Sequence, residues 1–146
     1  MMIMKLWATL LILLLATGCA NTVANRVDDS RRDTVHQTLD AFGQGYRQTN
    51  WASVQQFFSP GYYGGYEELR NKLENKWRNE RVLDIQFRLN RILESDGLFN
   101  VQVRWEKSYQ DNTTGSILKA SGLSELILES KGNSFRILKV DGDQFF

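Results

Sequence analysis

The N-terminal part of the folded region carries apolar residues with the period of an α-helix. The apolar residues recur at spacings of four, three and four, which is typical of one face of an amphipathic helix, at Val35, Leu39, Phe42 and Tyr46. The pair Ser30 and Asp33 resembles a capping arrangement, so we expect this helix to begin near Ser30. Gly43 and Gly45 interrupt its apolar face, and they indicate that another segment approaches the helix closely.

Two shorter helices follow this first helix. Asn50 is a typical N-cap residue, while Pro60 and Gly61 end the apolar segment behind it. We expect the apolar face of this second helix at Trp51, Val54, Phe57 and Phe58. A glycine- and tyrosine-rich connection then leads to a third helix, from Glu67 to about Glu80, with Leu69, Leu73 and Trp77 on one face.

After Arg81 the apolar period changes from that of a helix to that of a strand. Residues 83–90 and 99–106 alternate strictly between apolar and polar types, and the turn signal Ser95-Asp96-Gly97 separates them. A third strand is expected over residues 117–129, where the alternation slips and predicts a β-bulge near Gly122. The last strand, residues 135–140, is apolar on both faces, which favours a more central place in the sheet.

Helices followed by strands in sequential hairpins predict an α+β fold. We expect three N-terminal helices packed on one face of a curved four-stranded antiparallel sheet. Residues 30–146 resemble the nuclear-transport-factor-2-like (NTF2-like) superfamily, whose SnoaL-like and cystatin-like members form a cone. The resemblance rests on the element order, on "NWASVQQFFSPGYY" and on "NSFRILKVDGDQFF", in which Phe135 stands where the family commonly has tryptophan. The resemblance implies a cone whose open end forms a pocket.

The chain opens with a short apolar leader. Lys5 precedes an apolar run over residues 6–16, which only Thr9 interrupts, and small residues follow this run. This pattern is typical of a signal peptide, here over residues 1–18. The run is shorter than the roughly 20 apolar residues that cross a bilayer. Translation from Met1 or from Met4 would both give such a leader. The domain layout that we expect is leader, tether over residues 19–29, and folded domain over residues 30–146.

The end of the leader resembles a bacterial lipobox. In that family a small residue precedes a cysteine that receives diacylglycerol, here Gly18 and Cys19, although Ala16 stands where leucine is usual. Cys19 is the only cysteine, so lipidation would leave neither a disulfide nor a free thiol. Ala20, where aspartate would signal retention at the inner membrane, implies the outer membrane with the domain facing the periplasm. The alternative is an ordinary secreted protein with an incidental thiol.

Charge and residue types exclude several kinds of site. The chain has 18 basic and 17 acidic residues, one of the lysines lies in the leader, and such a balance argues against nucleic acid. A single histidine and a lipidated cysteine give little support for a metal site, and no cofactor motif is present. Asp141-Gly142-Asp143 is better interpreted as a turn than as calcium ligands.

Acid–base catalysis has one weak candidate, the pair His36 and Asp40 on the first helix, which is also a common surface pair. Isomerase-like members of the superfamily hold a general base near the segment that corresponds to residues 59–66, and this segment contains no Asp, Glu or His. Their first-helix tyrosine would fall near Phe42 or Gly43, so this role is unfilled too. These departures argue against an isomerase.

Aromatic residues are the remaining candidates, either as pocket lining and partner contacts or as core between helices and sheet: Tyr46, Tyr62, Tyr63, Tyr66 and Trp105, with Trp77 beside them. We therefore expect a lipid-anchored, non-catalytic periplasmic domain that binds an envelope protein partner or a small apolar ligand. One alternative is a ketosteroid-isomerase-like or SnoaL-like enzyme. Another is a homodimer through the outer face of the sheet, at Gln86, Arg88, Gln102 and Arg104.

Overall fold

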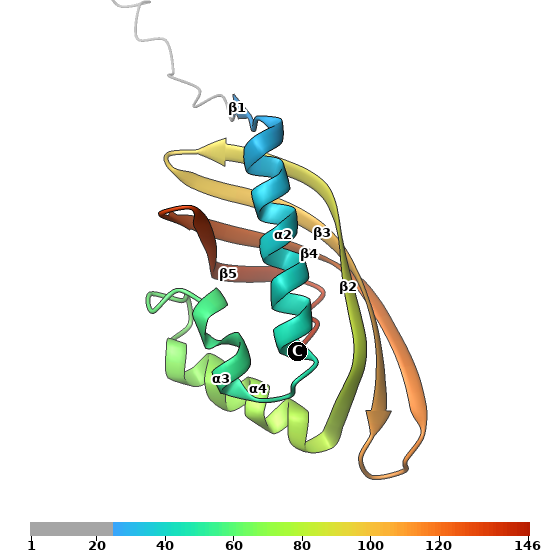
Figure 1. The fold of residues 1–146 in the computed structure, drawn as a ribbon. Helices are drawn as coiled ribbons and strands as arrows, with labels where there is room; N and C mark the ends of the chain where they lie inside the picture. Colours follow the sequence, from blue (N-terminus) through green and yellow to red (C-terminus); the bar gives the residue numbers. More distant parts are fainter. Residues whose placement is uncertain (1–24) are drawn as a thin grey trace, which may run out of the picture.

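The computed structural model describes residues 25–146. The leader, Cys19 and most of the expected tether lie outside these residues. Three helices lie inside the curve of one antiparallel sheet (Figure 1). The helical elements are α2 (Asp29–Tyr46), α3 (Trp51–Val54), the 3-10 turn η1 (Gln55–Phe57) and α4 (Tyr66–Asn79). The strands are β1 (Asn25–Arg26), β2 (Glu80–Ser95), β3 (Leu98–Asp111), β4 (Ile117–Lys131) and β5 (Ser134–Gly142).

The sheet runs in the order β1-β2-β3-β4-β5, with every pair of neighbours antiparallel. This topology confirms the expected α+β architecture. Asp96 and Gly97 form the two-residue turn between β2 and β3, and both have positive φ, 53° and 76°. Such turns match the twist of the strands that they connect. Within residues 25–146, no helix combines the length and the apolar character that a membrane span requires.

The first helix is capped earlier than the sequence suggests. Asp28 accepts a hydrogen bond from the Arg31 amide at 2.8 Å, so it takes the N-cap role that we expected at Ser30. Asn25–Arg26 pairs with β2 and Val27 is buried, so ordered contacts extend further toward the N-terminus than Ser30. The hydrogen-bonding capacity of an aspartate before the first turn explains the shift.

The second helix has the cap and the neighbour that the sequence predicts. The Asn50 side chain accepts from the Ser53 amide at 3.0 Å. A Cβ placed on Gly45 would lie 2.5 Å from the Ser53 carbonyl oxygen, and this confirms the expected close approach at that glycine. Glycine is therefore required where α2 and α3 meet.

Strand β2 does not keep the simple alternation that its sequence indicates. Its register against β3 shifts between Val82 and Asp84, and again between Leu89 and Arg91. The first shift leaves Leu83, which we expected on the buried face, 38% exposed and turns Val82 inward instead. At each register shift β2 has one extra residue, and beyond it the apolar side chains point toward the helices again. The strand can therefore bend around the helices and keep its apolar face buried.

The bulge expected at Gly122 is wrong. Strands β3 and β4 pair in unbroken register, with Gly122 directly opposite Trp105. A Cβ on Gly122 would lie 2.7 Å from the Trp105 ring and 2.6 Å from the Asp143 Cβ, so the glycine makes room for the indole. The apolar alternation slips because Ser124 points inward, where its hydroxyl oxygen accepts from Trp105 Nε1 at 3.0 Å.

The central position expected for β5 is also wrong, because β5 lies at the edge of the sheet. Residues 58–63 cover this edge. Ser59 donates its amide to the Ile137 carbonyl at 2.9 Å, and Tyr63 donates to the Leu138 carbonyl at 2.8 Å. A register shift against β4 explains the apolar pattern, because it leaves Leu138 as an extra residue and lets both Ile137 and Val140 point inward.

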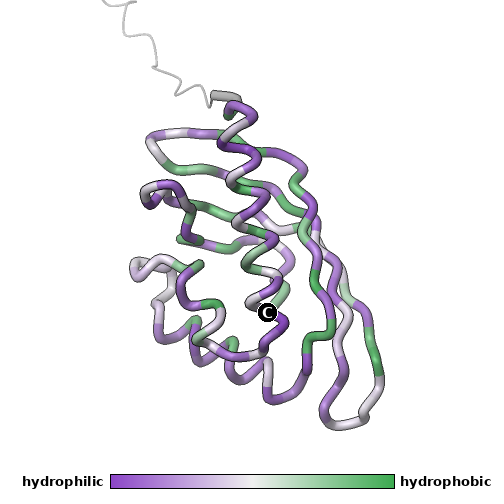
Figure 2. Tube along the Cα trace, viewed as in Figure 1, coloured by the Kyte–Doolittle hydropathy of each residue, from purple (hydrophilic) through white to green (hydrophobic). Residues whose placement is uncertain are grey.

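The core lies between the helices and the sheet. Apolar and polar stretches alternate along the long strands, and α4 presents mostly polar residues (Figure 2). Aromatic rings dominate the largest fully buried side chains, which include Tyr46, Phe42, Phe58, Phe99 and Phe145. Of the aromatic residues noted in the sequence, Tyr46, Trp77 and Trp105 are buried in this core.

Replacing Gly122 with alanine tests its role beneath the Trp105 indole. We expect Gly122→Ala to lower the free energy of unfolding by about 1–3 kcal/mol, because the methyl group has no space and the ring must move. Urea unfolding followed by tryptophan fluorescence measures the change. The neighbouring Ser121 is exposed, so Ser121→Ala is the matched control. Equal stability of both variants would contradict this role.

Candidate functional site

The interior of the cone is occupied by the end of the chain. Residues 143–146, the C-terminal segment, follow β5 and turn inward at Gly142, where φ is 81°. The chain ends beside the last turn of α2 (Figure 1). Phe145 is 1% exposed and Phe146 is 8% exposed. The space in which we expected a pocket is therefore filled.

The Phe145 ring lies in a cage of aromatic rings from three elements. Its centroid is 5.7 Å from that of Phe42, 5.9 Å from that of Tyr46 and 5.2 Å from that of Phe87. The indole of Trp105 lies 6.3 Å away. All four contacts are tilted toward edge-to-face geometry, which favours aromatic pairs in a core.

The Phe145 carbonyl anchors a buried polar cluster. Tyr46 donates its hydroxyl to this oxygen at 3.1 Å, and Lys107 donates an ammonium hydrogen at 3.0 Å. Lys107 also pairs with Glu80 at 2.5 Å, and the two side chains are 3% and 4% exposed. The Lys76 ammonium lies 3.5 Å from the other carboxylate oxygen of Glu80.

The charges of this cluster are compensated rather than poised for proton transfer. Burial lowers the pKa of Lys107, and the Glu80 carboxylate acts in the opposite direction. Burial raises the pKa of Tyr46 well above its usual value of 10.0, and the nearby charge of Glu80 raises it further. The phenol therefore stays protonated as a donor, and Glu80 is held by two lysines. Such an arrangement stabilises structure but offers no free general base.

His36 and Asp40 meet on the solvent side of α2. The His36 Nδ1 atom lies 3.1 Å from Asp40 Oδ2, and both side chains are more than half exposed. They border an open hollow of about 390 Å³ beside β2, where Arg47 lies 3.6 Å from Asp84. An open, polar hollow does not exclude water from the pair, so the contact alone makes no enclosed catalytic site.

The five aromatic residues singled out in the sequence occupy different places. Tyr46 and Trp105 lie in the cage around Phe145. Tyr66 packs on Trp51, with centroids 5.1 Å apart. Tyr62 is half-buried against the Phe58 ring, with centroids 5.8 Å apart, and Tyr63 beside it is 72% exposed.

Tyr62 and Tyr63 line a surface groove of about 360 Å³, which we call the tyrosine groove. The groove lies between the loop before α4, the start of α4 and the end of β5, with Phe146 in its wall. Lys139 lies 5.1 Å from the Tyr63 ring centroid, and Lys72 lies 5.0 Å from that of Phe146. Partial burial raises the pKa of Tyr62. Aromatic rings with lysines beside them suit an apolar or aromatic group, and Glu68 and Asp141 also line the groove.

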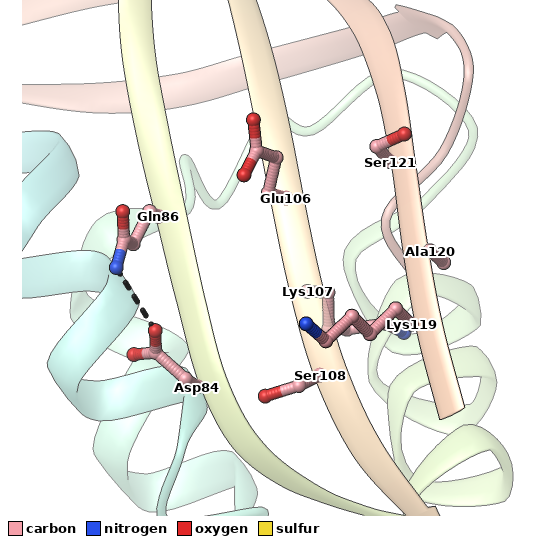
Figure 3. Close-up of a pocket in the computed structure, with 8 residues that line it drawn as sticks. All are labelled: Asp84, Gln86, Glu106, Lys107, Ser108, Lys119, Ala120 and Ser121. Carbon is pink, nitrogen blue, oxygen red and sulfur yellow. Dashed lines mark hydrogen bonds between the residues drawn. The ribbon is translucent and has the colours of Figure 1, made fainter. Parts of the chain in front are cut away.

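The outer face of the sheet carries a shallow polar hollow of about 380 Å³. Its residues come from three adjacent strands (Figure 3), and Gln86 Nε2 donates to Asp84 Oδ2 at 3.0 Å. Among the expected dimer residues, Gln86, Arg88 and Arg104 are exposed and Gln102 is half-buried. Within residues 25–146, no three side chains of His, Cys, Asp or Glu gather as metal ligands.

Glu80, Lys107 and Phe145 were not identified in the sequence. The signal for Lys107 was present, because it continues the inward alternation of Val101, Val103 and Trp105. Glu80 gave no such signal, since it lies at the junction of α4 and β2. Glu80, Lys107 and Phe145 are far apart in the sequence and come into contact only in the folded domain.

Comparisons with known proteins identify the fold. Neither a protein-family model nor a curated protein sequence matches the chain. A "ketosteroid isomerase-like protein" from Erwinia carotovora atroseptica has a TM-score of 0.64 at 12% identity, over 77% of this chain and 95% of that one. A "Nuclear transport factor 2 (NTF2-like) superfamily protein" from Salmonella enterica serovar Typhimurium has a TM-score of 0.63 at 11% identity, over 79% of this chain and 92% of that one. A "Putative calcium/calmodulin dependent protein kinase II association domain" from Xanthomonas campestris has a TM-score of 0.58 at 12% identity, over 82% of this chain and 91% of that one. The domain therefore has the NTF2-like fold.

Separate and joint replacement of Lys107 and Glu80 tests the buried pair. We expect Lys107→Met to lower the free energy of unfolding by about 3–5 kcal/mol, because Glu80 keeps a buried charge that has lost its nearest partner. The double variant Lys107→Met/Glu80→Leu should recover part of this loss. Urea unfolding measures both, with the exposed Lys119→Met as control. Strictly additive losses would show that the two side chains are not coupled.

Proposed function

We propose that this protein is a non-catalytic binding domain of the bacterial envelope. The observation that carries the proposal is the filled cone: Phe145 takes the place that a substrate would need. Glu80, the carboxylate beside that place, is paired with Lys107 and Lys76. The interior thus has little to offer an acid–base reaction, and binding at the surface is the better explanation.

The tyrosine groove is the binding surface that we favour. Tyr63 is exposed in the loop before α4. Gly64 and Gly65, the next two residues of this loop, have positive φ angles of 97° and 101°, which side chains other than glycine rarely adopt. Exposed tyrosine contributes strongly to protein interfaces because it combines apolar area with a polar hydroxyl. The groove is open rather than enclosed, which suits a segment of a partner protein better than a small ligand that needs most of its surface buried.

An acid–base enzyme is the alternative function. Its support is the contact between His36 and Asp40 together with the fold shared with the ketosteroid isomerase-like protein. At such low identity this similarity bears on the fold alone. Loss of cellular function in a folded His36→Ala variant would favour the enzyme over the binding domain.

The proposed location follows from the leader. Residues 1–18 have the pattern of a signal peptide and Cys19 follows a lipobox-like segment, so we propose a lipid anchor in the outer membrane. Several acyl chains would hold the domain stably at the bilayer. The groove would then face partners in the periplasm.

Changing Cys19 to serine tests the anchor. We expect Cys19→Ser to remove the acyl groups, so that the protein is either released to the aqueous phase in Triton X-114 partitioning or stranded at the membrane with its leader uncleaved. Mass spectrometry of the intact native protein should show the mass of the acyl groups. Ser30→Ala, in which the cysteine is kept, is the control. A native protein whose intact mass includes no acyl groups would exclude acylation at Cys19.

Site-specific crosslinking in intact cells tests the groove. A photoreactive benzoylphenylalanine at position 63 should give a discrete adduct with an envelope protein. The same residue at position 117 is the control, because Ile117 is also largely exposed, at 68%, but lies on the β3–β4 hairpin. With the partner identified, Tyr63→Ala should weaken its binding at least about 30-fold, which corresponds to the threshold of an interface hot spot, about 2 kcal/mol. Adducts only from position 117 would place the interface elsewhere.

A further inference from the structure

A second hollow lies beside the first turns of α2, at the opposite end of this helix from the aromatic cage. It has a volume of about 560 Å³, and its lining comes from the start of α2, from the β2–β3 hairpin and from the β4–β5 hairpin (Figure 1). We call it the hairpin hollow. None of the residues that line it belongs to the cage around Phe145 or to the tyrosine groove.

Two buried aromatic rings form the base of the hairpin hollow. The ring centroids of Phe99 and Phe135 are 4.9 Å apart, and the two residues are 2% and 6% exposed. The guanidinium carbon of Arg31 lies 5.6 Å from the Phe99 centroid and covers that ring. The base is therefore well packed but offers little free apolar surface, so an apolar ligand would gain little by binding there.

An ion pair with unused hydrogen-bonding capacity lies above this base. Arg31 Nη1 donates to Glu94 Oε2 at 2.8 Å and so connects α2 to β2, and the two side chains are 50% and 33% exposed. Within residues 25–146 this is the only hydrogen bond of either side chain. The other N–H groups of Arg31 and the second carboxylate oxygen of Glu94 are thus available to a ligand as donors and as an acceptor.

Short hydroxyl and amide side chains complete the lining. The Thr34 hydroxyl donates to the Ser30 carbonyl at 3.0 Å, and the Ser134 hydroxyl donates to the Lys131 carbonyl at 3.0 Å. Both hydroxyl oxygens can still accept hydrogen bonds. The Asn133 side chain is exposed and makes no hydrogen bond to another part of the described chain. Donors and acceptors from three separate segments therefore converge on one space.

The charges around the hairpin hollow balance. Among the described residues that line it, Arg31 and Glu94 are the only charged ones, and they are paired. Asp96 and Lys131 lie in the two hairpin turns outside the lining, and their charges are opposite. A phosphate or carboxylate would need positive charge that Glu94 already compensates. The hollow therefore suits a neutral ligand that is rich in hydroxyl groups.

We propose that the hairpin hollow binds a neutral oligosaccharide. Each sugar hydroxyl can donate and accept, which matches a site where Arg31 and Asn133 donate and Glu94 accepts. The volume is in the range of small-molecule sites, and the exposed Asn133 and Ser134 leave room for the rest of a longer glycan. This site is separate from the tyrosine groove, so the proposal depends neither on a protein partner nor on the lipid anchor.

Nuclear magnetic resonance titration of the full chain in detergent micelles tests the site. The neutral probes are N-acetylchitotetraose and maltotetraose, which differ in their acetamido groups and so distinguish two kinds of glycan, and tetragalacturonate is the anionic probe. We expect a neutral probe to shift the backbone amide signals of Thr34, Gly97 and Asn133. The signals of Tyr63 in the tyrosine groove and Ser121 on the outer face should stay unchanged.

Two results of this titration would overturn the proposal. One is the absence of shifts at Thr34, Gly97 and Asn133 with both neutral probes up to their solubility limits, whether or not other signals move. The other is binding of tetragalacturonate as strong as that of the neutral probes, because it would show that the hollow does not select an uncharged ligand.

An exposed asparagine provides the matched pair of variants. Asn133→Ala should weaken binding of the neutral probe about 2- to 10-fold, because one hydrogen bond to the sugar is lost. Asn71→Ala is the control, since Asn71 is also exposed but lies on α4, outside the hollow. Equal affinities of the two variants would contradict the role of Asn133 as a ligand donor.

Glu94→Gln tests why the ligand should be neutral. The variant removes the charge that compensates Arg31 and keeps a side chain that can accept a hydrogen bond. We expect it to gain measurable affinity for tetragalacturonate and to retain the affinity for the neutral probe within about tenfold. A variant that binds the neutral probe but still rejects the anion would refute charge compensation as the source of selectivity.

Discussion

The contact on which the rest of the structure depends is the burial of Phe145 between the end of α2 and the middle of the sheet. Its ring touches α2 through Phe42 and Tyr46, β2 through Phe87 and β3 through Trp105. Its carbonyl accepts a hydrogen bond from Lys107, which is paired with Glu80. Glu80 lies at the junction of α4 and β2. One residue thus fixes the distance between the helices and the curved sheet, and the curvature in turn sets the shape of the interior.

The buried charges serve this contact rather than a reaction. A lysine and a glutamate removed from water cost free energy that their attraction repays only with good geometry and further hydrogen bonds. Here Lys107 gains the Phe145 carbonyl and Glu80 gains Lys76. A different arrangement of the chain end would take the Phe145 carbonyl away from Lys107 and leave a buried donor without this acceptor.

Local patterns were sufficient for most of the fold and insufficient for the site. Helical spacing, the Asn50 cap and the turn at Asp96-Gly97 depend on neighbouring residues, so the sequence predicts them. The cap at Asp28 is a local contact, but Ser30 is an equally good cap residue and the pattern does not choose between them. The edge position of β5 and the role of Gly122 depend on contacts between distant segments, since residues 58–63 cover that edge and the Trp105 indole occupies the space beside Gly122. The aromatic cage depends entirely on such contacts. Phe145 lies beyond the last strand, so no helical or strand period in the sequence predicts that it is buried.

The covered edge of β5 has a consequence for how copies of this protein behave when they are crowded. An uncovered edge strand is a template on which another chain can extend the sheet, which leads to aggregation. Residues 58–63 already use the Ile137 and Leu138 carbonyls, so a neighbour would have to break those bonds before it could pair there. If the chain is tethered to a membrane as we propose, its diffusion is confined to two dimensions and encounters are frequent. The cover thus protects this edge of the sheet, whereas at the other edge β1 pairs only with Leu93 and Glu94 of β2.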